Sequence, residues 1–180
     1  SRGLGDVYKR QVRAEKDMLE QTMNGAVRAI TSILAASKPL FFGRSQRVKK
    51  LAFELANELK LLDDWRLELA STFSYLGYLT LPDEIQEKLY NHQKVPDEIM
   101  DVVKVFPNFA KEILKGIPRL EEITPIIYLI GEDYKETGSP ADDSAKLAPL
   151  IRLSQHYDHY ASDGYSRSDI FDILEKDSSI

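Results

Sequence analysis

The segment SQHYDHYASDGY concentrates groups that could bind a metal ion. His156 and His159 are three residues apart, so a helix would place both on one face, with Asp158 and Asp163 nearby. Imidazoles and carboxylates that converge on one point are ligands of zinc and related metals. One interpretation is therefore half of a metal site, which a divergent hydrolase would complete with Glu132.

The alternative interpretation, which we favour, is that these histidines are polar groups on the exposed side of an amphipathic helix. The chain has three histidines, so no second histidine cluster exists to complete a site. The third, His92, lies in the segment NHQKV and is expected at the surface. On this interpretation the protein binds no metal and has no catalytic residues.

The basic run GRSQRVKK could serve a different chemistry. Arg44, Arg47, Lys49 and Lys50 would attract an anion if the run opened a helix, because the first backbone N–H groups and the helix dipole favour negative charge. A solvated helix face with Val48 turned inward explains the same pattern, and we favour it.

Other enzyme classes are excluded by what the sequence lacks. There is no cysteine, so disulfides, thiolate metal sites and cysteine nucleophiles are absent. The sequence contains no nucleophile elbow, no phosphate-binding loop and no dinucleotide fingerprint.

Length and composition indicate one globular domain. The chain has 180 residues, of which 43% are hydrophobic and 29% charged. No stretch reaches the roughly 18 consecutive apolar residues that span a membrane, and no signal peptide is recognisable, so we expect a cytoplasmic protein without a membrane partner.

Residues 1–11, SRGLGDVYKRQ, differ from the rest and resemble translated sequencing adaptor, so we expect a non-native tail there. Three basic residues against Asp6 give this segment a net charge of +2, which leaves the remainder at −7 where the whole chain has −5. An acidic domain repels phosphate backbones, so broad nucleic-acid binding is not expected.

Apolar residues recur every three or four positions after Val12, which predicts a long amphipathic helix over 12–36. The apolar face of this helix extends into the highly charged segment RAEKDMLEQ. We therefore expect this linker helix to pair with its copy in a homodimer.

Further helical patterns and helix starts follow to the end of the chain. Pro82 and Pro96 are expected as first helical residues, and Ser166 as a capping residue with Asp169 three positions on. The short runs YLTL and PIIYLI lack sustained alternation, so the predicted fold is all-α. The expected helices are about 44–59, 63–75, 82–90, 97–105, 108–115, 120–130, 143–161 and one after Ser166.

Several of these segments together resemble one family over residues 20 to about 165. The run GRSQRV is similar to Gly-His-Ser-x-Arg-Val, and FSYLGYLTLPDEI is similar to LHDIGKIGIPDEI. VFPNFAKEIL resembles HPEIGAEIL, IIYLIGEDYKETGSP resembles HHERWDGSGYP, and IRLSQHYDHYASDGY resembles LAVADVFDALTSDRPY. These are motifs of the HD-GYP branch of the HD phosphohydrolase superfamily, metal-dependent phosphodiesterases of cyclic di-GMP in bacteria.

The resemblance implies an HD-domain-like helical bundle over 20–176 that has lost its metal ligands. Scaffold positions such as Arg47, Gly77 and Asp158 persist. At positions where the family has ligands or the motif lysine, this chain has Arg44, Ser74, Tyr75, Tyr78, Phe106, Ile130, Gly131 and Gln155. The iron, manganese or other divalent ion of the family is therefore not expected as a cofactor.

The function that this resemblance implies is a non-catalytic signalling module of a response regulator, with a receiver domain expected upstream and an unidentified protein as partner. Its binding residues would be those of the vestigial cleft, namely Arg44, Arg47, Ser74, Tyr75, Tyr78, Glu132 and Gln155. Two alternatives stay open: a divergent metal-dependent hydrolase using His156 and His159, and a pseudoenzyme that still binds a cyclic dinucleotide through Arg44.

Overall fold

The computed structural model describes residues 2–61, 64–131 and 144–177. Within these ranges the chain is helical without a strand, which confirms the all-α prediction. No helix among them is both long enough and apolar enough to cross a membrane.

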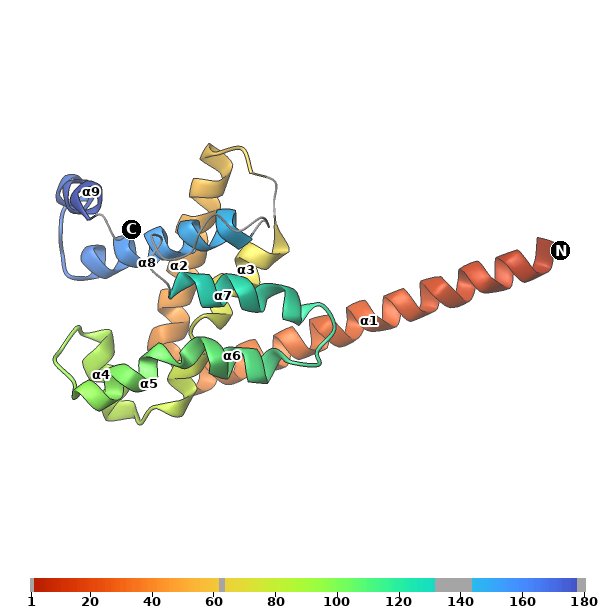
Figure 1. Cartoon of the computed structure of the whole chain (residues 1–180), viewed down its shortest axis with the longest axis horizontal. Helices are drawn as coiled ribbons and strands as arrows, with labels where there is room; N and C mark the ends of the chain where they lie inside the picture. The colour runs from red at the N-terminus through yellow and green to blue at the C-terminus, as the bar shows by residue number, and fades with distance from the viewer. Residues whose placement is uncertain (1, 62–63, 132–143, 178–180) are drawn as a thin grey trace.

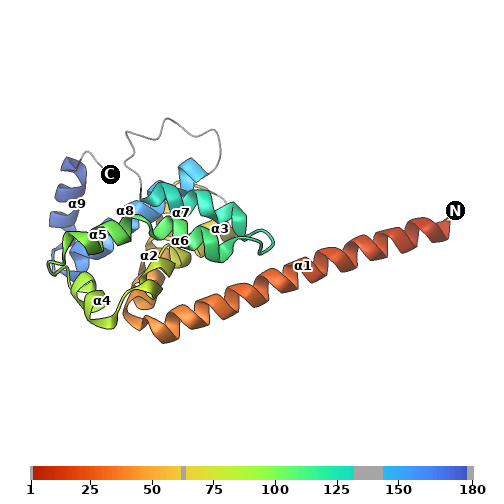
Figure 2. The same cartoon turned by 60° about the horizontal axis from the view of Figure 1, so that its bottom comes forward.

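The N-terminal helix α1, Arg2–Ser37, projects far from a bundle that the other helices form (Figure 1). Every residue from Arg2 to Thr22 is exposed, and the first buried residue is Met23. Only the C-terminal part of α1 packs on the bundle, against α2 and η1. A second view shows the same separation (Figure 2).

The bundle begins with α2, Pro39–Glu58, which starts where proline's missing N–H is not needed. Lys38, at the α1 to α2 junction, is buried and donates from Nζ to the carbonyl oxygen of Leu81 and to Asp83 Oδ1, both at 2.8 Å. This side chain ties the junction to the start of α4, so the sharp bend between α1 and α2 is fixed.

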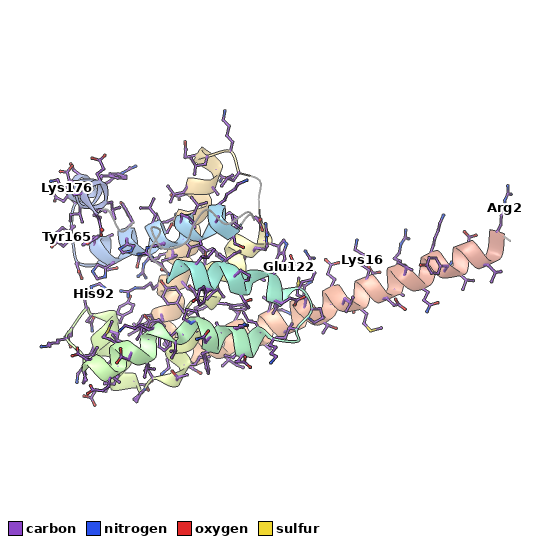
Figure 3. All side chains as sticks on the ribbon, in the orientation of Figure 1. Arg2, Lys16, His92, Glu122, Tyr165 and Lys176 are labelled. Carbon is purple, nitrogen blue, oxygen red and sulfur yellow. The ribbon has the colours of Figure 1, made fainter. Side chains whose placement is uncertain are left out.

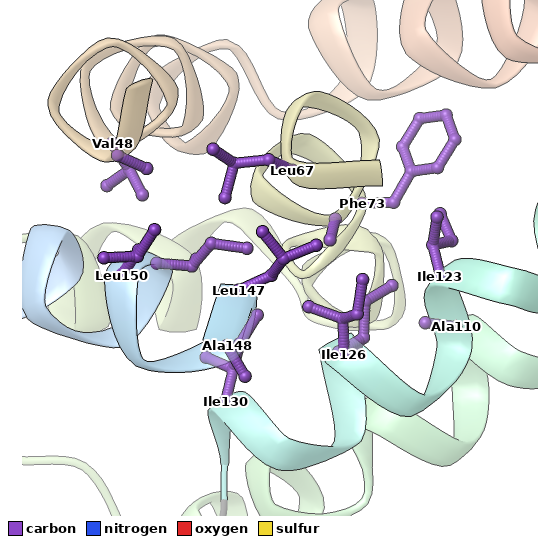
Figure 4. Close-up of a cluster of buried hydrophobic side chains, with 14 of the residues drawn as sticks. Val48, Leu67, Phe73, Ala110, Ile123, Ile126, Ile130, Leu147, Ala148 and Leu150 are labelled. Carbon is purple, nitrogen blue, oxygen red and sulfur yellow. The ribbon is translucent and has the colours of Figure 1, made fainter. Parts of the chain in front are cut away.

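The remaining elements wrap around α2. In chain order they are α3, Trp65–Phe73; η1, Leu76–Thr80; α4, Asp83–Tyr90; α5, Asp97–Lys104; α6, Phe106–Leu114; η2, Leu120–Ile123; α7, Thr124–Ile130; α8, Ser144–Ser162; and α9, Arg167–Lys176. The centre is α2 packed against α3 and α8, with α7 lying against α8. The core that they enclose is aliphatic, with side chains such as Val48, Leu67, Ile126 and Leu147 meeting from four helices (Figure 4).

Several helix boundaries differ from the sequence expectations. The backbone is helical from Pro39, because Gly43 is tolerated inside α2 rather than breaking it. Pro82 and Pro96 are N-capping residues rather than first helical residues, so α4 and α5 begin one position later, at Asp83 and Asp97. Ser166 caps α9 as predicted, accepting a hydrogen bond at 3.2 Å from the backbone N–H of Asp169.

Two other expectations also need correction. Residues 2–11 continue α1 instead of lying outside the helical pattern, although whether they are native stays a prediction. Leu59, the expected last residue of the helix over about 44–59, lies one position past the end of α2 and is 62% exposed.

Candidate functional site

The positions that the resemblance marks as metal ligands lie together around a cluster of aromatic rings. Phe41 stacks on Tyr78 with ring centroids 3.7 Å apart, and Tyr75 lies 5.8 Å from Tyr78. The ring of Phe106 meets Tyr78 edge-on at 4.9 Å, and Tyr90 meets Phe41 in the same way at 5.6 Å. Five elements or their junctions therefore contribute rings to one apolar contact, which the sequence predicted only for Tyr75 and Tyr78.

Burial makes these two phenols poor acids. Burial raises the pKa of Tyr75, helped by the neighbouring phenol of Tyr78 and opposed by Arg44. Burial likewise raises the pKa of Tyr78, again opposed by Arg44. Both side chains are consequently neutral at physiological pH and offer no phenolate for metal binding.

Gly77 allows the aromatic rings to pack closely. A Cβ at this position would overlap the Cβ, Cγ and Cδ1 atoms of Phe106. Its φ is not in the left-handed region, so the requirement for glycine here is steric.

A buried ion pair lies beside the rings. Arg47 donates to both carboxylate oxygens of Asp158, from Nε at 2.7 Å and from Nη2 at 3.0 Å. Arg44 Nε lies 3.4 Å from Asp158 Oδ2, and its Nη2 donates to the carbonyl oxygen of Tyr90 at 3.0 Å. The hydrogen bond to Asp158 raises the pKa of Arg47 further above its ordinary value.

This arrangement corrects the solvated-face interpretation for Arg44, whereas Val48 is buried and Lys50 exposed as that interpretation expects. The side chain of Arg44 is 10% exposed and its guanidinium lies over the Tyr90 ring, 4.3 Å from the centroid. The run also lies in the middle of α2, so the helix N-terminus cannot present an anion site to these arginines. Arg44 and Arg47 instead hold α2 against Asp158 of α8.

Ser74 and Gln155 form the polar edge of the same region. Ser74 Oγ donates to the carbonyl oxygen of Ser71 at 3.1 Å and accepts from Gln155 Nε2 at 3.4 Å. Gln155 also opposes the rise in the pKa of the Tyr75 hydroxyl. The predicted Glu132 lies outside the described residues, as do Gly138 and Pro140.

These residues do not fit the divalent metal of the resembled family. A guanidinium has only donors, and an amide, a serine hydroxyl and a neutral phenol replace imidazole and carboxylate groups. Phe106 and Ile130 supply apolar side chains, and both are buried. The region is built as an aromatic and hydrogen-bonded contact between helices.

A second polar cluster lies at the end of α8. His92 Nδ1 is 2.7 Å from Asp163 Oδ1, and His159 Nε2 is 3.9 Å from Asp163 Oδ2. The rings of His92 and His159 lie face to face at a tilt of 38°, with centroids 3.6 Å apart. Figure 3 shows His92 facing the end of α8, where Tyr165 lies.

This cluster corrects two expectations. His92 is not a free surface residue, because its side chain is 18% exposed and contacts His159 and Asp163. His156 and His159 are half-buried rather than exposed, and the structure pairs His159 with His92 instead of with His156. No periodic pattern could have indicated this contact, since 67 positions separate His92 from His159.

The two α8 histidines differ in their surroundings. Burial lowers the pKa of His159, and the charges of His92, Arg44 and His156 lower it further while Asp163 opposes them. Burial also lowers the pKa of His156, with Arg152 acting in the same direction and Asp177 against it. Both imidazoles therefore favour the neutral form at physiological pH.

Comparisons with known proteins identify the scaffold. The family model described as HD domain matches residues 28–153, which is well over half of the chain. No curated protein and no solved structure matches the chain.

Proposed function

The chain belongs to the HD domain family of the metal-dependent phosphohydrolase superfamily, and from this membership we propose that it is a non-catalytic signalling module. More specifically, it is a degenerate HD-GYP-type domain of a bacterial two-component response regulator that acts through protein–protein interaction. The proposal includes a receiver domain upstream of this domain and a protein partner that this domain binds.

The observation that carries the proposal is the aromatic contact among Phe41, Tyr75, Tyr78 and Phe106. Enzymes of this superfamily use bound metal to generate a hydroxide and to clamp phosphate oxygens. Packed rings in place of imidazoles and carboxylates cannot do either. Apolar replacement of a buried polar cluster is compatible with a stable fold, so the helical fold can stay stable after the catalytic groups are lost.

Binding of a cyclic dinucleotide is a weaker candidate. A phosphate would have to reach Arg44, which is buried and already engaged by Asp158 and the carbonyl oxygen of Tyr90. Displacing these contacts would leave the carbonyl oxygen of Tyr90 without its partner and Asp158 with Arg47 alone, and that costs free energy. Arg47, whose side chain is 46% exposed, is the more accessible of the two arginines.

The exposed part of α1 supports a role in assembly. Apolar side chains remain uncovered along its part after residue 11, among them Val12, Met18 and Leu19. Most helical stability in proteins comes from packing of an apolar face, so a partner helix is expected to cover these side chains. We propose that α1 pairs with its copy in a homodimer and couples a receiver to the bundle.

The proposal is tested with a response regulator that contains this domain behind its receiver. Crosslinking and co-purification are compared with and without phosphorylation of the receiver aspartate. The expected result is a bound protein, or a changed assembly, that depends on phosphorylation and requires this domain. A regulator whose partners and assembly are identical in both states contradicts the proposed signalling role.

A further inference from the structure

We propose that His92, His159 and Asp163 form a binding site for one divalent transition metal ion of the zinc class. None of the three occupies a position where the resembled family has a ligand. The site joins the turn after α4 to the end of α8, and the metal would act as a clasp between them.

Geometry and residue type carry this inference. One ligand atom from each residue lies within 4.8 Å of the others, and the carboxylate of Asp163 faces both rings. Ligand atoms on a tetrahedral zinc ion are about 3.3 Å apart, given bonds of about 2.0 to 2.1 Å. Movements of the ligand atoms of about 1 Å, made by side-chain rotation, would therefore bring all three within bonding distance of one ion. Two imidazoles and one carboxylate, with a fourth position left for water, form a common zinc ligand set.

The backbone holds the ligands from two directions. His92 lies just past the end of α4, with φ +54°, where helices usually end in glycine. The N–H of His92 bonds the carbonyl oxygen of Leu89 at 3.2 Å, and the N–H of Gln93 bonds that of Lys88 at 2.8 Å. This capping arrangement fixes the direction of the imidazole.

The other two ligands come from one helix end. The N–H of Asp163 bonds the carbonyl oxygens of His159 and Tyr160, at 3.2 and 3.1 Å, so Asp163 continues the last turn of α8. His159 and Asp163 are four positions apart and therefore lie on the same face. A histidine at a position that favours glycine, facing this pair, indicates a role beyond capping.

Arg44 limits the affinity of the site. Its Nη2 is 3.4 Å from His92 Nε2, so it repels a cation and favours the tautomer whose Nδ1–H points to Asp163. A metal at Nδ1 would require the proton to move to Nε2, so Arg44 Nη2 would lose its contact with His92 and keep its bond to the carbonyl oxygen of Tyr90. We therefore expect weaker binding than in closed four-ligand zinc sites.

The test is calorimetric titration of the chelator-treated full chain with Zn²⁺, supported by the visible absorption spectrum of bound Co²⁺. The variants are His92→Asn, His159→Gln and Asp163→Asn; asparagine is chosen at position 92 because it tolerates positive φ. The control is His156→Gln, which removes a half-buried histidine of α8 outside the cluster. Circular dichroism of each metal-free variant establishes that it is folded.

The expected result is one Zn²⁺ per chain, at least about tenfold weaker binding in each of the three variants, and unchanged binding in the control. Bound Zn²⁺ should also raise the Tm of the wild type and not that of Asp163→Asn, which alters an exposed side chain. Absence of one-to-one binding, or binding that the three variants leave unchanged, overturns the proposal.

A further pair of variants separates this inference from the proposed function. Ser74→Ala and Gln155→Ala alter the region where the family would hold its metal. If these variants abolish Zn²⁺ binding while His92→Asn does not, the metal lies in the family position, and both proposals are wrong. If they leave Zn²⁺ binding intact, the proposed site is separate from the region where the family would hold its metal.

Discussion

Asp158 is the residue on which the polar part of the candidate site depends. Its buried carboxylate is bonded twice by Arg47 and lies 3.4 Å from the guanidinium of Arg44. Removing one partner of a buried ion pair leaves the opposite charge without compensation, which costs more than the pair itself contributes.

We expect Asp158→Asn to destabilise the protein by about 3 kcal/mol, because Arg44 stays buried beside a neutral amide. Urea unfolding followed by circular dichroism measures the change. The control, Arg44→Met with Asp158→Leu, removes the two buried charges together, while Arg47 keeps access to water because its side chain is 46% exposed. This control should recover more than half of the loss. If Asp158→Asn were as stable as the wild type, the ion pairs of Asp158 would not contribute to the stability of the fold.

At the residue scale, the sequence was a better guide to which positions lie close together than to the contacts that their side chains make. The resemblance placed Tyr75 and Gln155 in the vestigial cleft and Phe106 at a former ligand position. In the structure Gln155 contacts Ser74, and the rings of Tyr75 and Phe106 both meet that of Tyr78. The direction of Arg44 and the pairing of His92 with His159 were not predicted. Both depend on side-chain orientation between segments far apart in sequence, which periodicity does not report.

At the scale of elements, the aromatic cluster is a link between helices. Phe41 comes from α2, Tyr78 from η1, Tyr90 from α4 and Phe106 from α6. Offset and edge-on ring pairs each contribute about 0.5 to 1.5 kcal/mol beyond burial, so the set is a substantial constraint.

The raised pKa values of Tyr75 and Tyr78 make this constraint sensitive to alkali. A phenol whose folded pKa lies above its unfolded value of about 10 contributes stability that is complete below that value. The contribution is lost as the pH rises from about 10 through the folded pKa. We therefore expect the free energy of unfolding to fall steeply above pH 10 in the wild type.

The matched variant is Tyr75→Phe with Tyr78→Phe, which keeps the rings and removes the titrating hydroxyls. Urea unfolding at several pH values between 8 and 11 compares the two proteins, so that lysine titration is common to both. The variant should lose less stability over this range. Equal losses would show that the phenols ionise as freely in the folded state as in the unfolded state.

The helices themselves were largely predictable, because apolar spacing, proline and the Ser166 cap are local signals. The boundaries that failed, at Gly43 and Leu59, depend on tertiary packing, which tolerates glycine within α2 and leaves Leu59 outside. The runs YLTL and PIIYLI fall within or across η1 and α7, as expected for an all-α chain.

At the scale of the whole molecule, the dominant feature is the contrast between a packed bundle and the projecting α1 (Figure 1). The apolar residues that α1 leaves exposed are the basis for the proposed homodimer, because helices in proteins gain most of their stability from packing an apolar face.

We expect Leu19→Glu to convert a dimer to a monomer, because a charge would be buried in the helix pair. Leu19 is exposed, so the bundle should keep its own stability. Gln21→Glu adds the same charge on the other side of α1 and should remain dimeric. Sedimentation velocity across a range of concentrations distinguishes the outcomes; a wild type that stays monomeric throughout disproves the pairing.

The central claim, that this HD domain no longer catalyses phosphodiester hydrolysis, is tested most directly by a hydrolysis assay. The chain is incubated with cyclic di-GMP in the presence of Mn²⁺ or Fe²⁺, and the products are separated by chromatography. The predicted result is no product above a protein-free control with the same metal. Turnover that scales with protein concentration and is lost in His156→Gln with His159→Gln would contradict the claim and establish a divergent hydrolase.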